Sequence, residues 1–230
     1  MFATTQKFLS KASKLNIVHE VTPGNHSYFM FNDGGVEVEV AEFLYAFVHL
    51  IKAKTILETG THQGISASFM GQALLELGEE DKVTTLEIIP EHFRDSNQLF
   101  ASLGVANNVV SLFEDSRQYL PQVGTSLDIL FLDSEPQYRF EEFERFWPYV
   151  RENGYIMIHD LGENLGFHDS FYDVSPTEKV YSWPYGDFKV RLGPYIQRHD
   201  VQLITFQTPR QMVLFQKTAH ASEARKLLVR

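Results

Sequence analysis

The order of apolar and amphipathic segments is the feature that most constrains the fold of this chain. From residue 55 onward, short apolar segments typical of buried strands alternate with longer segments whose apolar residues recur at helical spacing. The strand candidates cover 55–59, 82–88, 108–113, 127–133 and 155–160, and the helical candidates between them cover about 63–77, 90–103, 116–122 and 136–150. This alternation predicts an α/β fold with a parallel sheet, because parallel strands need crossover connections that cover the faces of the sheet.

The last two apolar segments depart from this order. Residues 201–207 and 210–216 are separated only by Thr208 and Pro209, so we expect them to pair antiparallel as a hairpin. The sequence therefore predicts a doubly wound α/β fold whose seven-stranded sheet is mostly parallel and ends in a C-terminal antiparallel hairpin.

The length of the chain sets the expected domain organisation. A chain of 230 residues suffices for one sizeable core, and we predict a single domain over 1–230. Within it, residues 1–35 form an N-terminal helix and cap segment. Residues 161–186 are too long for a minimal connection and rich in aromatic side chains, so we predict that this insertion is a lid over the acceptor. A dimer contact or plain packing is the alternative, and the N-terminal helix and the lid are the surfaces that a homodimer would use.

Charge and residue content exclude several partners and chemistries. The formal net charge is -10 and the basic residues are scattered, which disfavours nucleic acid as a partner. No stretch approaches about 18 consecutive apolar residues, so no membrane partner is expected. The chain has no cysteine, which removes thiolate chemistry and fits a cytoplasmic location.

The turn after the first strand has the composition of a ligand-binding loop. Gly60 and Gly64 allow a tight turn and a close approach of the backbone to a ligand. The helix that begins near Gln63 offers free N–H groups to the carboxylate of a bound amino acid, and Ser66 adds a hydroxyl donor. An ordinary glycine-containing turn between strand and helix is the alternative.

Polar residues follow the next strands in the same way. Glu87 ends the second strand, where a carboxylate can accept both hydroxyls of a ribose, and Asp115 with Ser116 follows the third strand, on the side of an adenine amino group. Asp133 ends the fourth strand. Because the carboxyl ends of parallel strands meet at one edge of a sheet, these residues predict a nucleotide cleft. NAD is disfavoured, since the third glycine of its usual motif is missing.

Five segments carry a resemblance to a known family. They are ILETGTHQGIS, TTLEIIP, EDSRQYLP, DILFLDSE and GYIMIHD, and in this order and spacing they resemble the catechol and caffeoyl-CoA O-methyltransferase group and related bacterial small-molecule methyltransferases. The resemblance implies a Rossmann-like class I methyltransferase fold and S-adenosylmethionine as cofactor. It also implies the roles of individual residues: Glu58, Gly60, Gly64 and Ser66 bind the methionine part, Glu87 the ribose, Asp115 and Ser116 the adenine, with Asp133 beside the cofactor.

The resemblance further implies a divalent metal at Asp133, His159 and Asp160, where the ion would bind and acidify a substrate hydroxyl. His159 stands where the family usually has Asp. A mixed nitrogen and oxygen set suits Mn²⁺, Fe²⁺ or Zn²⁺ at least as well as Mg²⁺. Two alternatives stay open: His159 serves as general base without a metal, or His159 and Asp160 simply cap the strand.

The catalytic lysine of the family falls at or next to Pro136, and no lysine stands there. Arg139 is near but stays protonated and cannot act as a base. His159 and His168 are therefore the candidates for the proton acceptor, and Asp133 is the third residue for which we predict a catalytic role. We predict a transferase that methylates a hydroxyl oxygen of a small molecule. The alternatives are a metal-independent N- or O-methyltransferase with a histidine base and a non-catalytic nucleotide-binding protein.

Overall fold

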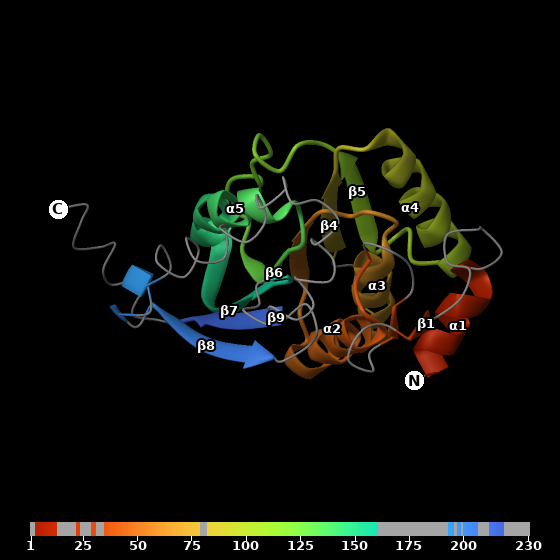
Figure 1. Ribbon diagram of the computed structural model, residues 1–230, viewed down its shortest axis with the longest axis horizontal. Helices are drawn as coiled ribbons and strands as arrows, with labels where there is room; N and C mark the ends of the chain where they lie inside the picture. The colour runs from red at the N-terminus through yellow and green to blue at the C-terminus, as the bar shows by residue number, and fades with distance from the viewer. Residues whose placement is uncertain are drawn as a thin grey trace, which may run out of the picture. The chain divides into compact units, whose positions relative to one another are not determined.

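Seven strands of the computed structural model form one mixed sheet (Figure 1). They are β3 (Thr55–Thr59), β4 (Lys82–Glu87), β5 (Val109–Phe113), β6 (Leu127–Leu132), β7 (Val150–Ile158), β8 (Val201–Phe206) and β9 (Met212–Lys217), in the spatial order β5-β4-β3-β6-β7-β9-β8. The short strands β1 (Thr22–Pro23) and β2 (Phe29–Met30) pair in a separate sheet. The predicted seven-stranded, mostly parallel sheet with a C-terminal antiparallel hairpin is confirmed.

The structure describes residues 3–12, 22–23, 29–30, 35–78, 82–160, 193–195, 197–198, 200–206 and 212–218. The predicted lid over 161–186 lies outside these residues, as does His168. The chain divides into two compact units, Met1–Leu120 and Pro121–Arg230, which are described one at a time. Among the described residues, no helix is both long and apolar enough to span a membrane.

Among the residues that the structure describes in the first unit are three parallel strands and four α-helices. The helices are α1 (Ala3–Ala12), α2 (Val38–Ile51), α3 (Ile65–Leu77) and α4 (Pro90–Leu103), and α4 runs alongside the edge strand β5 (Figure 1). In the parallel ladders, Thr59 of β3 lies opposite Leu86 of β4, and Glu87 lies opposite Phe113 of β5. The carboxyl ends of the three strands are therefore level at one edge, so the residues that follow them gather there.

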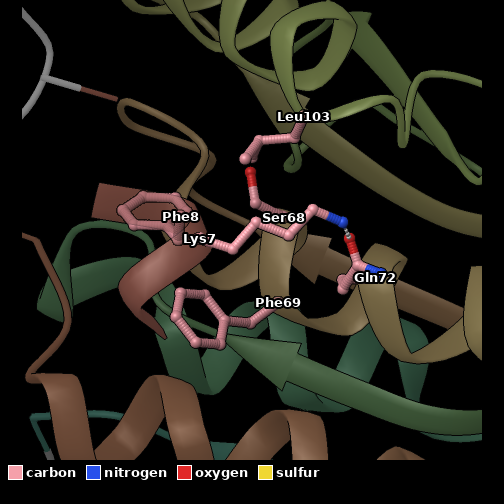
Figure 2. Close-up of a pocket in the computed structure, with 6 residues that line it drawn as sticks. All are labelled: Lys7, Phe8, Ser68, Phe69, Gln72 and Leu103. Atoms are coloured by element: carbon pink, nitrogen blue, oxygen red, sulfur yellow. Dashed lines mark hydrogen bonds between the residues drawn. The ribbon is translucent and has the colours of Figure 1, made fainter. Parts of the chain in front are cut away.

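A small cavity lies where α1 packs on α3. The Phe8 and Phe69 rings meet with their centroids 5.1 Å apart, and Lys7 Nζ donates to Gln72 Oε1 at 3.4 Å (Figure 2). The cavity has a volume of about 10 Å³. A space of this size holds at most one water molecule, so this cavity is part of the packing and not a ligand site.

The second unit is built around the C-terminal strands. β6 pairs parallel with β7, and β9 pairs antiparallel with both β7 and β8. The helix α5 (Arg139–Phe146) is flanked by two 3-10 turns, η3 (Pro136–Tyr138) and η4 (Trp147–Tyr149). The fully buried Phe143 of α5 contacts the rings of Trp147, Tyr195 and Phe215. These aromatic contacts anchor α5, and so fix the loop that joins it to β6.

The predicted helix over 116–122 is wrong. Residues 116–118 form a turn, and the chain reaches β6 without a helix. The Asp115 carboxylate accepts the backbone N–H of Arg117 at 2.9 Å, which closes a local turn that competes with a helical start. Pro121 then lacks the N–H that a helix interior needs.

Position 64 requires glycine both for its backbone conformation and for the packing around it. It is the N-cap of α3 with φ 81°, in the left-handed region that favours glycine. A Cβ on Gly64 would lie 2.7 Å from Phe100 Cε1 and 2.9 Å from Ser96 Cβ, both on α4. Gly64 therefore allows α3 and α4 to approach each other, a role that the sequence pattern assigned only to ligand approach.

We expect Gly64→Ala to lower the free energy of unfolding by roughly 2–5 kcal/mol, because a left-handed alanine costs about 1–2 kcal/mol and overpacking adds about 1–3. Gly78→Ala is the matched control: Gly78 also has a positive φ, 72°, but a Cβ there meets nothing within 4 Å. Urea unfolding of both variants checks the difference. Equal losses would contradict the packing role of Gly64.

Candidate functional site

The loop after β3 is bonded to the end of β4. The N–H groups of Gly60 and Thr61 both donate to the carbonyl oxygen of Leu86, at 3.1 Å each. Gly60 has φ 82° and His62 has φ 47°, so two residues of this loop adopt left-handed backbone, which is uncommon for histidine. The strained loop turns back across β4 and brings His62 to Glu87.

The Glu87 carboxylate holds this loop in place. Its Oε2 accepts the N–H of His62 at 2.7 Å, and its Oε1 accepts the N–H groups of Ile88 and Ile89 at 2.9 and 2.8 Å. The side chain is buried, with only 6% of the residue exposed. These bonds fix the direction of the carboxylate.

Glu58 lies at the centre of a buried network of hydroxyl groups. Ser66 donates to Glu58 Oε1 and Thr85 donates to Glu58 Oε2. The Thr61 and Thr85 hydroxyls are also in contact, and because Thr85 gives its single proton to Glu58, Thr61 must be the donor in that pair. The Ser66 hydroxyl thus donates its single proton to Glu58. Its predicted donation to a ligand carboxylate would need the hydroxyl to turn away from Glu58, and it stays a prediction.

Neither Thr61 nor Thr85 is predicted from the sequence as part of the site. Thr85 lies directly opposite Glu58 in the parallel register of β3 and β4. A buried carboxylate in a strand needs donors from its neighbours, so the pairing register is the signal that could have found Thr85.

Asp115 pairs with a residue close to it in sequence. Its carboxylate accepts from the Arg117 side chain through both oxygens, with Arg117 Nη2 2.6 Å from Oδ2. Arg117 is exposed, and Ser116 is partly exposed in the turn between them. Asp115 and Ser116 thus follow β5 at the same strand edge as Gly60 and Glu87, as the sequence predicted, but an adenine amino group would have to share Asp115 with Arg117.

In the second unit, the ends of β6 and β7 bring together Asp133, His159 and Asp160. Leu132 and Ile158 are opposite each other, and the His159 N–H donates to the Leu132 carbonyl oxygen at 3.1 Å, so the following residues are level. His159 Nδ1 lies 2.9 Å from Asp133 Oδ1 and 3.7 Å from Asp160 Oδ1. Asp160 has φ 54°, a left-handed backbone that directs its side chain back toward the cluster.

Arg139 joins this cluster from the first residue of α5. Each of its three guanidinium nitrogens meets an oxygen: Nε donates to the Ser134 carbonyl at 2.7 Å and Nη1 donates to the His159 carbonyl. Nη2 lies 3.4 Å from Asp133 Oδ1 and 3.3 Å from Asp160 Oδ2. Only 5% of the arginine side chain is exposed. The sequence excludes Arg139 as a base, but only the tertiary structure shows that its guanidinium is buried between two carboxylates.

The donor atoms of Asp133, His159 and Asp160 lie within 4.8 Å of one another, so their types and spacing suit a divalent ion. The guanidinium of Arg139 already faces both carboxylates, however, and His159 Nδ1 at 2.9 Å from Asp133 is at hydrogen-bond distance. A divalent ion would have to displace a buried cation of the protein. The residues as they stand therefore do not fit a metal.

Comparison with known proteins places these residues in a family context. The model of a family described as "Methyltransferase domain" matches residues 57–161. A protein of Mycobacterium sp. (strain KMS), provisionally named an O-methyltransferase, is 27% identical over 128 residues, which are 55% of this chain and 57% of that protein. The match thus spans little more than half the length of this curated relative.

Two solved structures share the fold. The O-methyltransferase from Bacillus cereus in complex with S-adenosylhomocysteine has a TM-score of 0.68 at 18% identity, over 95% of this chain and 92% of that one. A protein from Staphylococcus aureus, provisionally assigned as a caffeoyl-CoA O-methyltransferase, has a TM-score of 0.69 at 17% identity, over 91% and 90% of the two chains. The resemblance to O-methyltransferases inferred from the sequence is confirmed in the fold and in the match of residues 57–161 to a methyltransferase domain.

We expect Thr85→Val to lower the free energy of unfolding by roughly 1–3 kcal/mol, because the buried Glu58 carboxylate loses a donor. Thr84→Val, on the same strand but only partly buried, is the matched control and should change the free energy of unfolding by less than about 0.5 kcal/mol. Denaturant titration of the two variants measures both. A neutral Thr85→Val would mean that the hydroxyl network does not stabilise Glu58.

Proposed function

We propose that this chain moves the methyl group of S-adenosylmethionine to an oxygen of a small-molecule acceptor; the family match over residues 57–161 and the fold shared with solved O-methyltransferases support this. One observation carries the proposal. The loop that begins at Gly60 is hydrogen-bonded to the Glu87 carboxylate through the N–H of His62, where the parallel strands β3 and β4 end side by side. This edge is where open α/β sheets bind their ligands.

The cofactor part of the proposal assigns a chemical role to each group. The first turn of α3 begins at Gly64, which has no side chain to cap it, so its N–H groups suit the carboxylate of the methionine part. Glu87 is held by three amides, two on Oε1 and one on Oε2, so Oε2 is the oxygen with a lone pair left for a ribose hydroxyl. Asp115 and Ser116 would bind the adenine of the cofactor. The solved Bacillus cereus relative holds S-adenosylhomocysteine, the product that such a transfer leaves.

The reaction itself is an in-line displacement. A bond forms between the acceptor oxygen and the methyl carbon while the sulfur–carbon bond breaks and its electron pair stays on sulfur. The acceptor hydroxyl must lose its proton in the course of this step. The protein therefore has to align the acceptor with the methyl group and accept one proton.

His159 is the proposed proton acceptor. An imidazole whose Nδ1–H donates to Asp133 Oδ1, at 2.9 Å, keeps Nε2 unprotonated and able to take a proton. Asp133 would orient the ring and stabilise the imidazolium that forms. His168 stays a second candidate from the sequence alone. This assignment corresponds to the histidine-base alternative of the sequence analysis, and it routes no step through a metal.

We expect Glu87→Ala to weaken the binding of S-adenosylhomocysteine roughly ten- to a hundredfold, since a charged hydrogen-bond acceptor contributes about 1.5–3 kcal/mol. Isothermal titration calorimetry measures the affinity. Glu91→Ala, an acidic residue in the first turn of α4, is the control for lost negative charge and should bind as the parent does. Because Glu87 also holds the loop at His62, thermal unfolding must show that the variant is folded. Unchanged affinity in a folded Glu87→Ala protein would refute the ribose assignment.

A further inference from the structure

The cluster at the ends of β6 and β7 contains a cation of its own. Two carboxylates, Asp133 and Asp160, approach each other around His159 in a region where the side chains are almost fully buried. Like charges at this distance and burial need a positive group between them. The only Arg or Lys side chain that the described part of the structure pairs with them is Arg139.

We propose that the Arg139 guanidinium is the resident cation of this cluster and takes the position that a divalent metal would otherwise hold. Its Nη2 lies nearly the same distance from both carboxylates, 3.4 Å from Asp133 and 3.3 Å from Asp160, so it is shared between them rather than paired with one. The inference rests on the proposed function, which it deepens: the methyl transfer is independent of divalent metal, and Arg139 is a positioning residue.

The other nitrogens of Arg139 keep the guanidinium in this position. Nε and Nη1 donate to the carbonyl oxygens of Ser134, just after β6, and His159, just after β7. Ser134 is held in turn, because its hydroxyl donates to the buried Glu142 of α5 at 2.6 Å. A planar fork bound on three sides cannot swing away at small cost, as a flexible surface arginine would.

Charge explains why the arginine and an ion exclude each other. With Arg139 in place, one positive charge faces two carboxylates, and a divalent ion added among the same oxygens would lie next to a buried guanidinium that is always protonated. Asp160, whose carboxylate faces Arg139, has a left-handed backbone, which costs free energy that the surrounding structure must offset. The cluster is therefore built around the arginine.

The test is a titration of the full-length protein, freed of metal with EDTA, with MnCl₂ up to millimolar concentration. Free Mn²⁺ is followed by electron paramagnetic resonance and stability by thermal unfolding. We expect the parent protein to bind no stoichiometric Mn²⁺ and its Tm to be the same with Mn²⁺ and with EDTA. Binding of one Mn²⁺ per chain that is lost in Asp160→Asn would overturn the proposal.

The complementary experiment is the same Mn²⁺ titration of the variant Arg139→Gln. Removing the cation while keeping a polar side chain should create a site for one Mn²⁺ per chain, which the double variant Arg139→Gln/Asp160→Asn should lose. Arg145→Gln, an exposed position on the same helix, is the matched control and should behave as the parent does. A folded Arg139→Gln protein that binds no Mn²⁺ would also refute the proposal. If that variant does not fold, the titration of the parent protein decides by itself.

The same samples separate this inference from the proposed function. Calorimetry with S-adenosylhomocysteine tests the cofactor cleft of the first unit, whereas the Mn²⁺ titration involves neither cofactor nor acceptor. Absence of S-adenosylhomocysteine binding, with the Mn²⁺ results as expected, would refute the methyltransferase proposal and leave the role of Arg139 standing. The reverse result would refute the role of Arg139 alone.

Discussion

A carboxylate removed from water costs several kcal/mol unless donors replace the lost hydration, and this chain buries carboxylates at or near the ends of its parallel strands. Glu58, Glu87 and Asp160 are all buried, and Asp133 is nearly so. Much of the local structure at these strand ends supplies hydrogen-bond donors to the buried carboxylates. The backbone of His62 and the first residue of α5 are positioned by that requirement.

The two units meet the requirement in different ways. In the first, hydroxyl groups donate to Glu58 and amide groups donate to Glu87, whose Oε2 accepts only one of them and has a lone pair left. In the second, Asp133 and Asp160 face the guanidinium of Arg139, which neutralises much of their charge. The first arrangement suits the recognition of hydroxyl groups on a ligand. The second suits a fixed scaffold that orients His159.

Much of the fold follows from sequence pattern. The predicted strands agree with the structure to within two residues at each end, because buried strands flanked by helices carry a strong apolar signal; the exception is β7, which begins at Val150, five residues before the predicted start. The helix predicted over 116–122 does not form, because the Asp115 carboxylate accepts the N–H of Arg117 and closes a turn. In a segment this short, one such local hydrogen bond is enough to favour a turn over a helix. The single-domain prediction and the lid stay predictions, with the lid outside the described residues.

What the sequence by itself determined is which polar residues follow which strand: Gly60, Glu87, Asp115, Asp133 and His159 with Asp160 all stand at strand ends. Since neighbouring parallel strands end level, topology brings Gly60, Glu87 and Asp115 together in the first unit and Asp133, His159 and Asp160 together in the second. What only the tertiary structure decided is the partner of each charge. Thr85 meets Glu58 through strand register, and Arg139 reaches Asp133 and Asp160 because the aromatic packing of α5 sets where its first residue lies. Hydrogen bonds and ion pairs depend on distances of a few ångströms between residues far apart in the chain, and no periodicity in the sequence encodes those distances.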